Sequence, residues 1–108
     1  MPMSSYRMKM IVHVSIPNQP FSSYVRDGSI GEKVQRILNE IKPEAVYFCE
    51  YSGQRGAIMI VDVQDASKVP GISEPWFLLF DARAEFHLAM TPEDLEKSGL
   101  DKLGRKWV

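Results

Sequence analysis

The stretch KMIVHVSIP, residues 9–17, alternates between two kinds of side chain. Val12 and Val14 point to one side of an extended strand, and Ile11 and His13 point to the other, because successive side chains of a strand project to opposite faces. One face is therefore apolar and the other is mixed. A strand of this kind borders a core on one side only, so it belongs to a sheet whose second face carries polar groups.

Three further stretches have the composition of β-strands, at residues 44–51, 57–63 and 82–90. The first two are separated by SGQRG, residues 52–56, whose serine and glycines favour a turn. Two strands joined by a short glycine-containing loop are typical of a β-hairpin. The sequence therefore predicts four strands, of which the second and third are adjacent.

A helical region separates the first strand from the second. Asn18 is predicted to cap a short first piece, and Ser29 has capping-box spacing to Glu32 at the start of a longer one. Pro43 ends this longer helix. Its apolar residues follow the i, i+3, i+4, i+7 spacing of one helix face; they are Val34, Ile37, Leu38 and Ile41.

A second helical region separates the third strand from the fourth. It begins at a cap on Asp65 and is predicted to divide at Pro70-Gly71. The segment WFLLF, residues 76–80, follows and is apolar nearly all round, so it is expected to be well buried.

The order of these elements is β-α-β-β-α-β, which predicts an α+β, ferredoxin-like domain spanning residues 1–108. Such a domain is one four-stranded antiparallel sheet with both helices on one face. The first and third strands are expected in its middle, with the fourth beside the first and the second beside the third.

After the fourth strand, Thr91 and Pro92 mark the start of a short terminal helix, which is predicted to stop near Gly99. Trp107 lies beyond that helix. Its side chain is expected to pack either onto the body of the domain or onto a partner, whereas Trp76 is expected in the core.

The predicted strands divide into two sets of side chains. The set expected to meet the helices is almost wholly apolar: Met10, Val12, Val14, Val46, Phe48, Met59, Val61, Val63, Ala84, Phe86, Leu88 and Met90. The other set is too polar for a second core and too apolar to face water comfortably. It comprises Ile11, His13, Ser15, Tyr47, Cys49, Tyr51, Ile58, Ile60, Asp62, Arg83, Glu85 and His87. A symmetric partner sheet would cover it, which predicts a homodimer enclosing a partly polar cavity.

Composition limits the classes of function. The formal net charge is −1, so no long-range attraction favours binding to nucleic acid. The single cysteine excludes an intrachain disulfide and a cysteine metal cluster. No run approaches the ~18 apolar residues of a membrane span. The start MPMSSYRMKM has no apolar signal-peptide region, so a cytoplasmic protein is expected. No phosphate loop, dinucleotide fingerprint, nucleophile elbow or zinc motif is present, and no cofactor is predicted.

The mixed face supplies the candidate ligand-binding residues: His13, Ser15, Tyr47, Cys49, Tyr51, Arg83, Glu85 and His87. His13 and His87 are also the candidate catalytic residues, because imidazole exchanges protons near neutral pH. Each has an ordinary alternative: an interface histidine with a satisfied hydrogen bond, a cysteine that only packs, tyrosines that only fill an interface. No metal site is predicted, since neither an HxH nor an HExxH motif occurs.

Four segments carry a family resemblance: KPEAVYF, GQRGA, EPWFLLF and MTPEDL, within a likeness that covers about residues 8–105. The chain resembles a bacterial family of small uncharacterised proteins in the dimeric α+β barrel superfamily. The resemblance implies a homodimer with two facing sheets. It assigns no reaction: relatives elsewhere in the superfamily include cofactor-free monooxygenases, muconolactone isomerases, haem-degrading enzymes and stress-response proteins, and no motif of theirs maps onto this sequence.

Three hypotheses of function follow. The first is a homodimer that binds a small, partly aromatic or anionic metabolite in the sheet-face cavity. The second is a cofactor-free enzyme of the monooxygenase or isomerase type that uses a cavity histidine. The third is a structural or stress-related dimer without a ligand.

Overall fold

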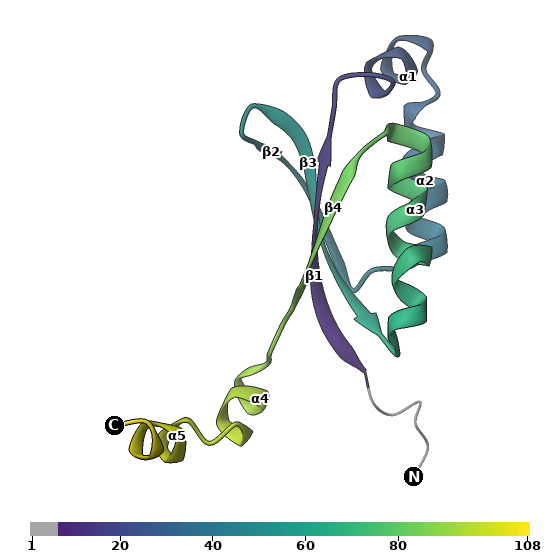
Figure 1. The fold of residues 1–108 in the computed structure, drawn as a ribbon. Helices are drawn as coiled ribbons and strands as arrows, with labels where there is room; N and C mark the ends of the chain where they lie inside the picture. The colour runs from purple at the N-terminus through teal and green to yellow at the C-terminus, as the bar shows by residue number, and fades with distance from the viewer. Residues whose placement is uncertain (1–6) are drawn as a thin grey trace.

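The computed structural model of the protein describes residues 7–108 and shows an α+β fold. Helices α2 and α3 lie side by side on one face of a single sheet, and the opposite face is not covered (Figure 1). The strands are β1 (Met8–Ile16), β2 (Ala45–Tyr51), β3 (Gln54–Val63) and β4 (Arg83–Leu88). The helices are α1 (Phe21–Asp27), α2 (Ile30–Ile41), α3 (Val69–Phe80), α4 (Pro92–Lys97) and α5 (Leu100–Lys106), with a 3₁₀ turn at Ala66–Lys68 before α3. Among the described residues, no helix is long and apolar enough to cross a bilayer.

The sheet is antiparallel and has the order β2-β3-β1-β4, so β1 and β3 are the middle strands, as the sequence predicts. Val12 lies opposite Met59 on one side and Phe86 on the other. Because the side-chain period of a strand is two, this register assigns every residue of the four strands to a face. The two predicted sets of side chains therefore do lie on opposite faces of the sheet.

The core lies between the sheet and helices α2 and α3. Val12 and Val14 of β1, Met59 of β3, and Trp76 and Phe80 of α3 are all fully buried. Ile37 of α2 is buried too, and Val34 and Ile41 pack against the cluster, which confirms the predicted helix face. Ser29 precedes α2 but its side chain makes no capping bond, so the predicted capping box is wrong. Instead the Asp27 carboxylate accepts the Ser29 backbone N–H at 2.8 Å.

The β2–β3 hairpin is tighter than predicted. Its turn is Ser52-Gly53, with φ of 52° and 78°, and β3 starts already at Gln54 rather than at residue 57. Two residues with positive φ are what a two-residue turn between twisted strands requires. The Glu50 carboxylate accepts the Gly53 backbone N–H and so fastens the turn.

Helix α3 is continuous, and the predicted break at Pro70-Gly71 is wrong. Pro70 lies in the first turn, where a backbone N–H would have no partner within the helix. The expectation that residues 76–80 are buried throughout is also wrong, because Leu78 is 79 % exposed. A single helix layer has an outer side, and Leu78 lies on it.

Three residues predicted to meet the helices are exposed instead: Phe48, Leu88 and Met90. Phe48 is on the edge strand β2, beyond the cover that α2 provides. Leu88 is the last residue of β4, and the chain leaves the sheet there, before the predicted end at residue 90.

Beyond β4 the chain forms an arm, residues 91–108, that projects away from the sheet and from α1, α2 and α3 (Figure 1). Helix α4 begins at a capping box in which Thr91 and Asp94 exchange side-chain to backbone hydrogen bonds, as the predicted helix start requires. Gly99 adopts a left-handed conformation, and a second helix that the sequence analysis did not predict, α5, follows it.

Candidate functional site

The uncovered side of the sheet, here called the open face, carries all eight residues that the sequence analysis proposed for ligand binding. The strand register arranges them in rows across the sheet. One row runs Cys49, Gly56, Ser15, Arg83; the next runs Tyr47, Ile58, His13, Glu85; a third runs Ala45, Ile60, Ile11, His87. Tyr51 lies opposite Gln54 at the hairpin end of the same face.

His13 is a half-buried side chain in the middle of this face. Its ring meets the ring of Tyr51 edge to face, with centroids 4.2 Å apart and an interplanar angle of 85°. Its Nε2 atom is buried and has no hydrogen-bond partner among the residues the structure describes. A buried ring nitrogen without a hydrogen-bond partner costs free energy.

Gly56 explains how Tyr51 reaches His13. A Cβ atom at Gly56 would lie 3.2 Å from the backbone oxygens of Cys49 and Val14 and 3.6 Å from Cβ of Tyr51. With no side chain at residue 56, the tyrosine lies across β3 and its ring arrives at β1. The sequence contains both residues, but only the register shows that one makes room for the other.

The fourth strand adds charged groups beside His13. Glu85 lies directly opposite His13 across the β1–β4 pairing. Its Oε2 atom is 3.6 Å from Nε2 of His87, and both of those side chains are well exposed. Arg83 lies opposite Ser15, one row closer to the hairpin end. A carboxylate therefore contacts one imidazole, that of His87, and lies in the same row as a second, that of His13, with a guanidinium and a hydroxyl in the neighbouring row.

The remaining candidates lie farther from His13. Tyr47 is 68 % exposed and Cys49 is exposed as well, both on the edge strand β2. Within residues 7–108, no three histidine, cysteine, aspartate or glutamate side chains are close enough together to hold a metal ion.

An ion-pair cluster lies at the end of the open face farthest from the hairpin. The sequence analysis did not propose it. Lys9 of β1 donates to the carboxylates of Glu44 and Asp62, the latter at 3.4 Å. The hydrogen bond to Glu44, followed by the charge of Asp62, raises the pKa of Lys9 above its ordinary value of 10.5. The Lys9–Asp62 pairing across β1 and β3 follows from the register, which the sequence does not state.

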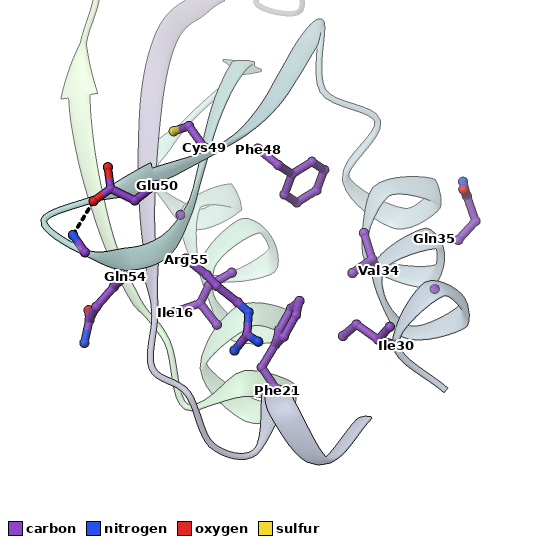
Figure 2. Close-up of a pocket in the computed structure, with 13 residues that line it drawn as sticks. Ile16, Phe21, Ile30, Val34, Gln35, Phe48, Cys49, Glu50, Gln54 and Arg55 are labelled. Carbon is purple, nitrogen blue, oxygen red and sulfur yellow. Dashed lines mark hydrogen bonds between the residues drawn. The ribbon is translucent and has the colours of Figure 1, made fainter. Parts of the chain in front are cut away.

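A large hollow lies on the other side of the sheet. It is a groove of about 730 Å³ between the hairpin and helices α1 and α2, lined mainly by Ile16, Phe21, Ile30, Val34, Phe48 and Arg55. Figure 2 shows the Phe48 ring and the Arg55 side chain pointing into it from neighbouring strands. Sequence analysis assigned Phe48 to the core, and only its place on an edge strand leaves this groove uncovered.

The two charged groups that line this groove are already engaged. Arg55 donates to Ser22 at 3.0 Å, and its guanidinium lies 4.7 Å from the centre of the Phe21 ring. Glu50 is occupied by the turn at Gly53. A large apolar hollow is the usual first candidate for a ligand site. Two buried side-chain nitrogens have no hydrogen-bond partner among the described residues, Nε1 of the core residue Trp76 and Nε2 of His13. Of the two, only His13 lies on a sheet face that no helix covers, so the open face is the stronger candidate for specific recognition.

Comparison with protein-family models, with curated proteins and with solved structures finds no match to this chain.

Proposed function

We propose that the protein is a homodimer of the dimeric α+β barrel type that binds a small, planar, anionic or partly aromatic metabolite between two facing sheets. The observation that carries this proposal is the buried and unpartnered Nε2 of His13 beside the Tyr51 ring. A ligand with a carboxylate or phenolate oxygen would satisfy that nitrogen when it acts as a donor, and its ring would stack or pack on aromatic side chains.

The dimer is part of the proposal because the open face is too apolar to stay in water. Ile11 and Ile58 are each more than a third exposed in the single chain, and the rings of Tyr47 and Tyr51 are more than half exposed. Adjacent exposed apolar side chains on one face are typical of an interaction surface. A twofold-related copy would cover this face with the same groups and would leave the polar side chains around a shared cavity.

Native mass spectrometry of the full-length protein, purified from cells without denaturation, tests both parts. We expect a dimer that carries additional mass, and we expect His13→Phe to lose that mass while remaining dimeric. A dimer that shows no additional mass, and no chemical-shift change on addition of 4-hydroxybenzoate as a planar anionic probe, would contradict the ligand proposal.

The dimer has its own test. Ile60→Asp places a charge in the middle of the open face, where Ile60 lies opposite Ile11 on β1 and Ala45 on β2. We expect this variant to be monomeric or aggregated by sedimentation velocity, because burying an unpaired carboxylate is costly. The control is Leu78→Asp on the outer side of α3, which is expected to remain a dimer. An unchanged solution mass for Ile60→Asp would contradict the proposed interface.

A second candidate function is proton transfer on the bound molecule without a cofactor. The observation that favours it is Glu85, which lies opposite His13 and within 3.6 Å of His87. A carboxylate beside an imidazole can orient the ring and stabilise its protonated form, as a general base requires. Solvent deuterium exchange into the bound metabolite, lost in a His87→Phe protein that still carries the metabolite by native mass spectrometry, would distinguish catalysis from binding alone.

A further inference from the structure

The arm of residues 91–108 is amphipathic and, among the residues that the structure describes, contributes no side chain to the buried core. Leu100 and Leu103 lie one turn apart in α5, and Trp107 follows the end of the helix four positions after Leu103, which places all three on one side of it. Their side chains are 56 %, 42 % and 75 % exposed. Lys102 and Arg105 lie on the opposite side of α5. The buried core and the residues packed on it end at Phe86, before the arm begins.

Helices as short as these do not persist by themselves. Helix α4 has six residues and α5 has seven, whereas isolated helices below about 12–15 residues are marginal in water. Helical stability in proteins comes mainly from packing an apolar face. An apolar face on α5 therefore indicates a surface that lies outside the single chain.

The dimensions of the chain point the same way. Its radius of gyration is 17.4 Å, against about 13 Å for a compact domain of this length. Its accessible surface is 7818 Å², against about 6,100 Å² for a folded monomer of this size. The excess is larger than the ~800 Å² that each partner contributes to a standard protein interface.

A second copy of this chain is the partner that best fits the exposed apolar side of α5. The arm continues directly from β4, an edge strand of the open face, so a copy seated on that face lies next to the start of the arm (Figure 1). Residues 91–108 carry four acidic and four basic side chains, which gives no charge preference for nucleic acid or an anionic membrane. The formal net charge of the whole chain, −1, does not oppose self-association.

We propose that residues 91–108 are a dimerisation arm, in which the Leu100, Leu103 and Trp107 side chains of each copy pack against the body of the other copy. This inference rests on the proposed dimer and extends it, because the open face alone would form an interface without the arm. An exchanged pair of arms is isologous, so each substitution in the arm acts twice in one dimer.

The test uses full-length protein with 5-fluorotryptophan at its two tryptophans, Trp76 and Trp107. Trp76 is fully buried within the chain and serves as the internal reference, and Trp107→Phe assigns the two ¹⁹F signals. The solvent isotope shift between H₂O and D₂O reports the exposure of each indole. We expect Trp107 to be protected at concentrations where the protein is dimeric and to become exposed on dilution.

Sedimentation velocity on the same protein measures the dimer dissociation constant. Leu103→Asp is expected to raise that constant by about tenfold or more, since it removes a buried leucine and adds a charge in both arms. The control, Lys102→Gln, makes the same change in net charge on the opposite side of α5 and is expected to leave the constant within about twofold. Because Leu103 is outside the core, neither variant removes a core contact.

The outcomes separate the arm from the open face. A wild-type dimer in which Trp107 stays exposed, or in which Leu103→Asp has no effect, overturns the arm and leaves the open-face dimer in place. A wild-type protein that is monomeric at all concentrations overturns both proposals. A dimer weakened by Leu103→Asp and unaffected by Lys102→Gln, with Trp107 protected, supports the arm.

Discussion

Replacing His13 with phenylalanine tests, through protein stability rather than ligand binding, whether the His13 ring carries a buried nitrogen without a hydrogen-bond partner. The buried Nε2 of His13 has no hydrogen-bond partner among residues 7–108. A buried polar atom left unsatisfied costs about 1–3 kcal/mol. Phenylalanine has a similar shape, carries no polar atom, and keeps the edge-to-face contact with Tyr51.

We therefore expect His13→Phe to raise the free energy of unfolding by about 1 kcal/mol, the lower end of that range, because phenylalanine is slightly larger than histidine. For a domain of this length, that corresponds to an increase in Tm of about 4–8 °C. Functional sites commonly lower the stability of a protein, so that replacing a polar site residue by an apolar one raises the free energy of unfolding.

The assay is equilibrium unfolding in urea at equal protomer concentrations, on protein refolded from denaturant so that no metabolite remains bound. The matched control is His87→Phe on the neighbouring strand, whose side chain is 62 % exposed. Exposed substitutions usually change stability by less than about 0.5 kcal/mol. A loss of about 1 kcal/mol or more in the stability of refolded His13→Phe would correspond to a lost hydrogen bond. That result would mean that Nε2 of His13 has a partner, and it would refute the prediction.

Two further predictions follow from local geometry. Gly56→Ala is expected to lower the free energy of unfolding by about 1–2 kcal/mol, because the new Cβ would lie 3.2 Å from the backbone oxygens of Cys49 and Val14. The control, Gly71→Ala, adds its Cβ in open space within α3 and is expected to raise the free energy of unfolding by about 0.5–1 kcal/mol. Equal effects of the two substitutions in urea unfolding would contradict the predicted crowding at Gly56. The backbone hydrogen bond from Thr91 holds the pKa of Asp94 below its ordinary 3.8, so the carboxylate stabilises α4 above that pH and the stabilisation is lost as the pH falls through the lowered value. As the pH falls below 3.8, carbon chemical shifts of residues 92–97 are expected to lose helical character in the wild type but not in Asp94→Asn, and a loss that persists in the variant would implicate another group.

Periodicity in the sequence was sufficient for the layers of the fold. The alternation around Val12 and Val14 identified the core face of β1, and the spacing of Val34, Ile37 and Ile41 identified the core face of α2. These patterns are local, since each depends only on the geometry of one strand or one helix. The same alternation placed all eight candidate ligand residues on the open face.

Local patterns failed where the position of an element within the whole molecule mattered. Phe48 alternates correctly with its neighbours, yet it is exposed because β2 is at the edge of the sheet and α2 does not reach over it. Leu88 continues the pattern of β4, yet the chain leaves the sheet at that residue. Neither the exposure of Phe48 nor the end of β4 at Leu88 is indicated by the side-chain pattern of the ten or so residues around it.

The sequence by itself determined that this protein has one apolar and one mixed sheet face, because side-chain alternation follows from the extended backbone alone. Only the tertiary structure decided that Tyr51 crosses Gly56 to enclose His13, and that helix α5 lies far from the core. The first depends on the register of three strands, and the second on where the last strand stops. Both are fixed by contacts between segments distant in the chain, which no local pattern encodes.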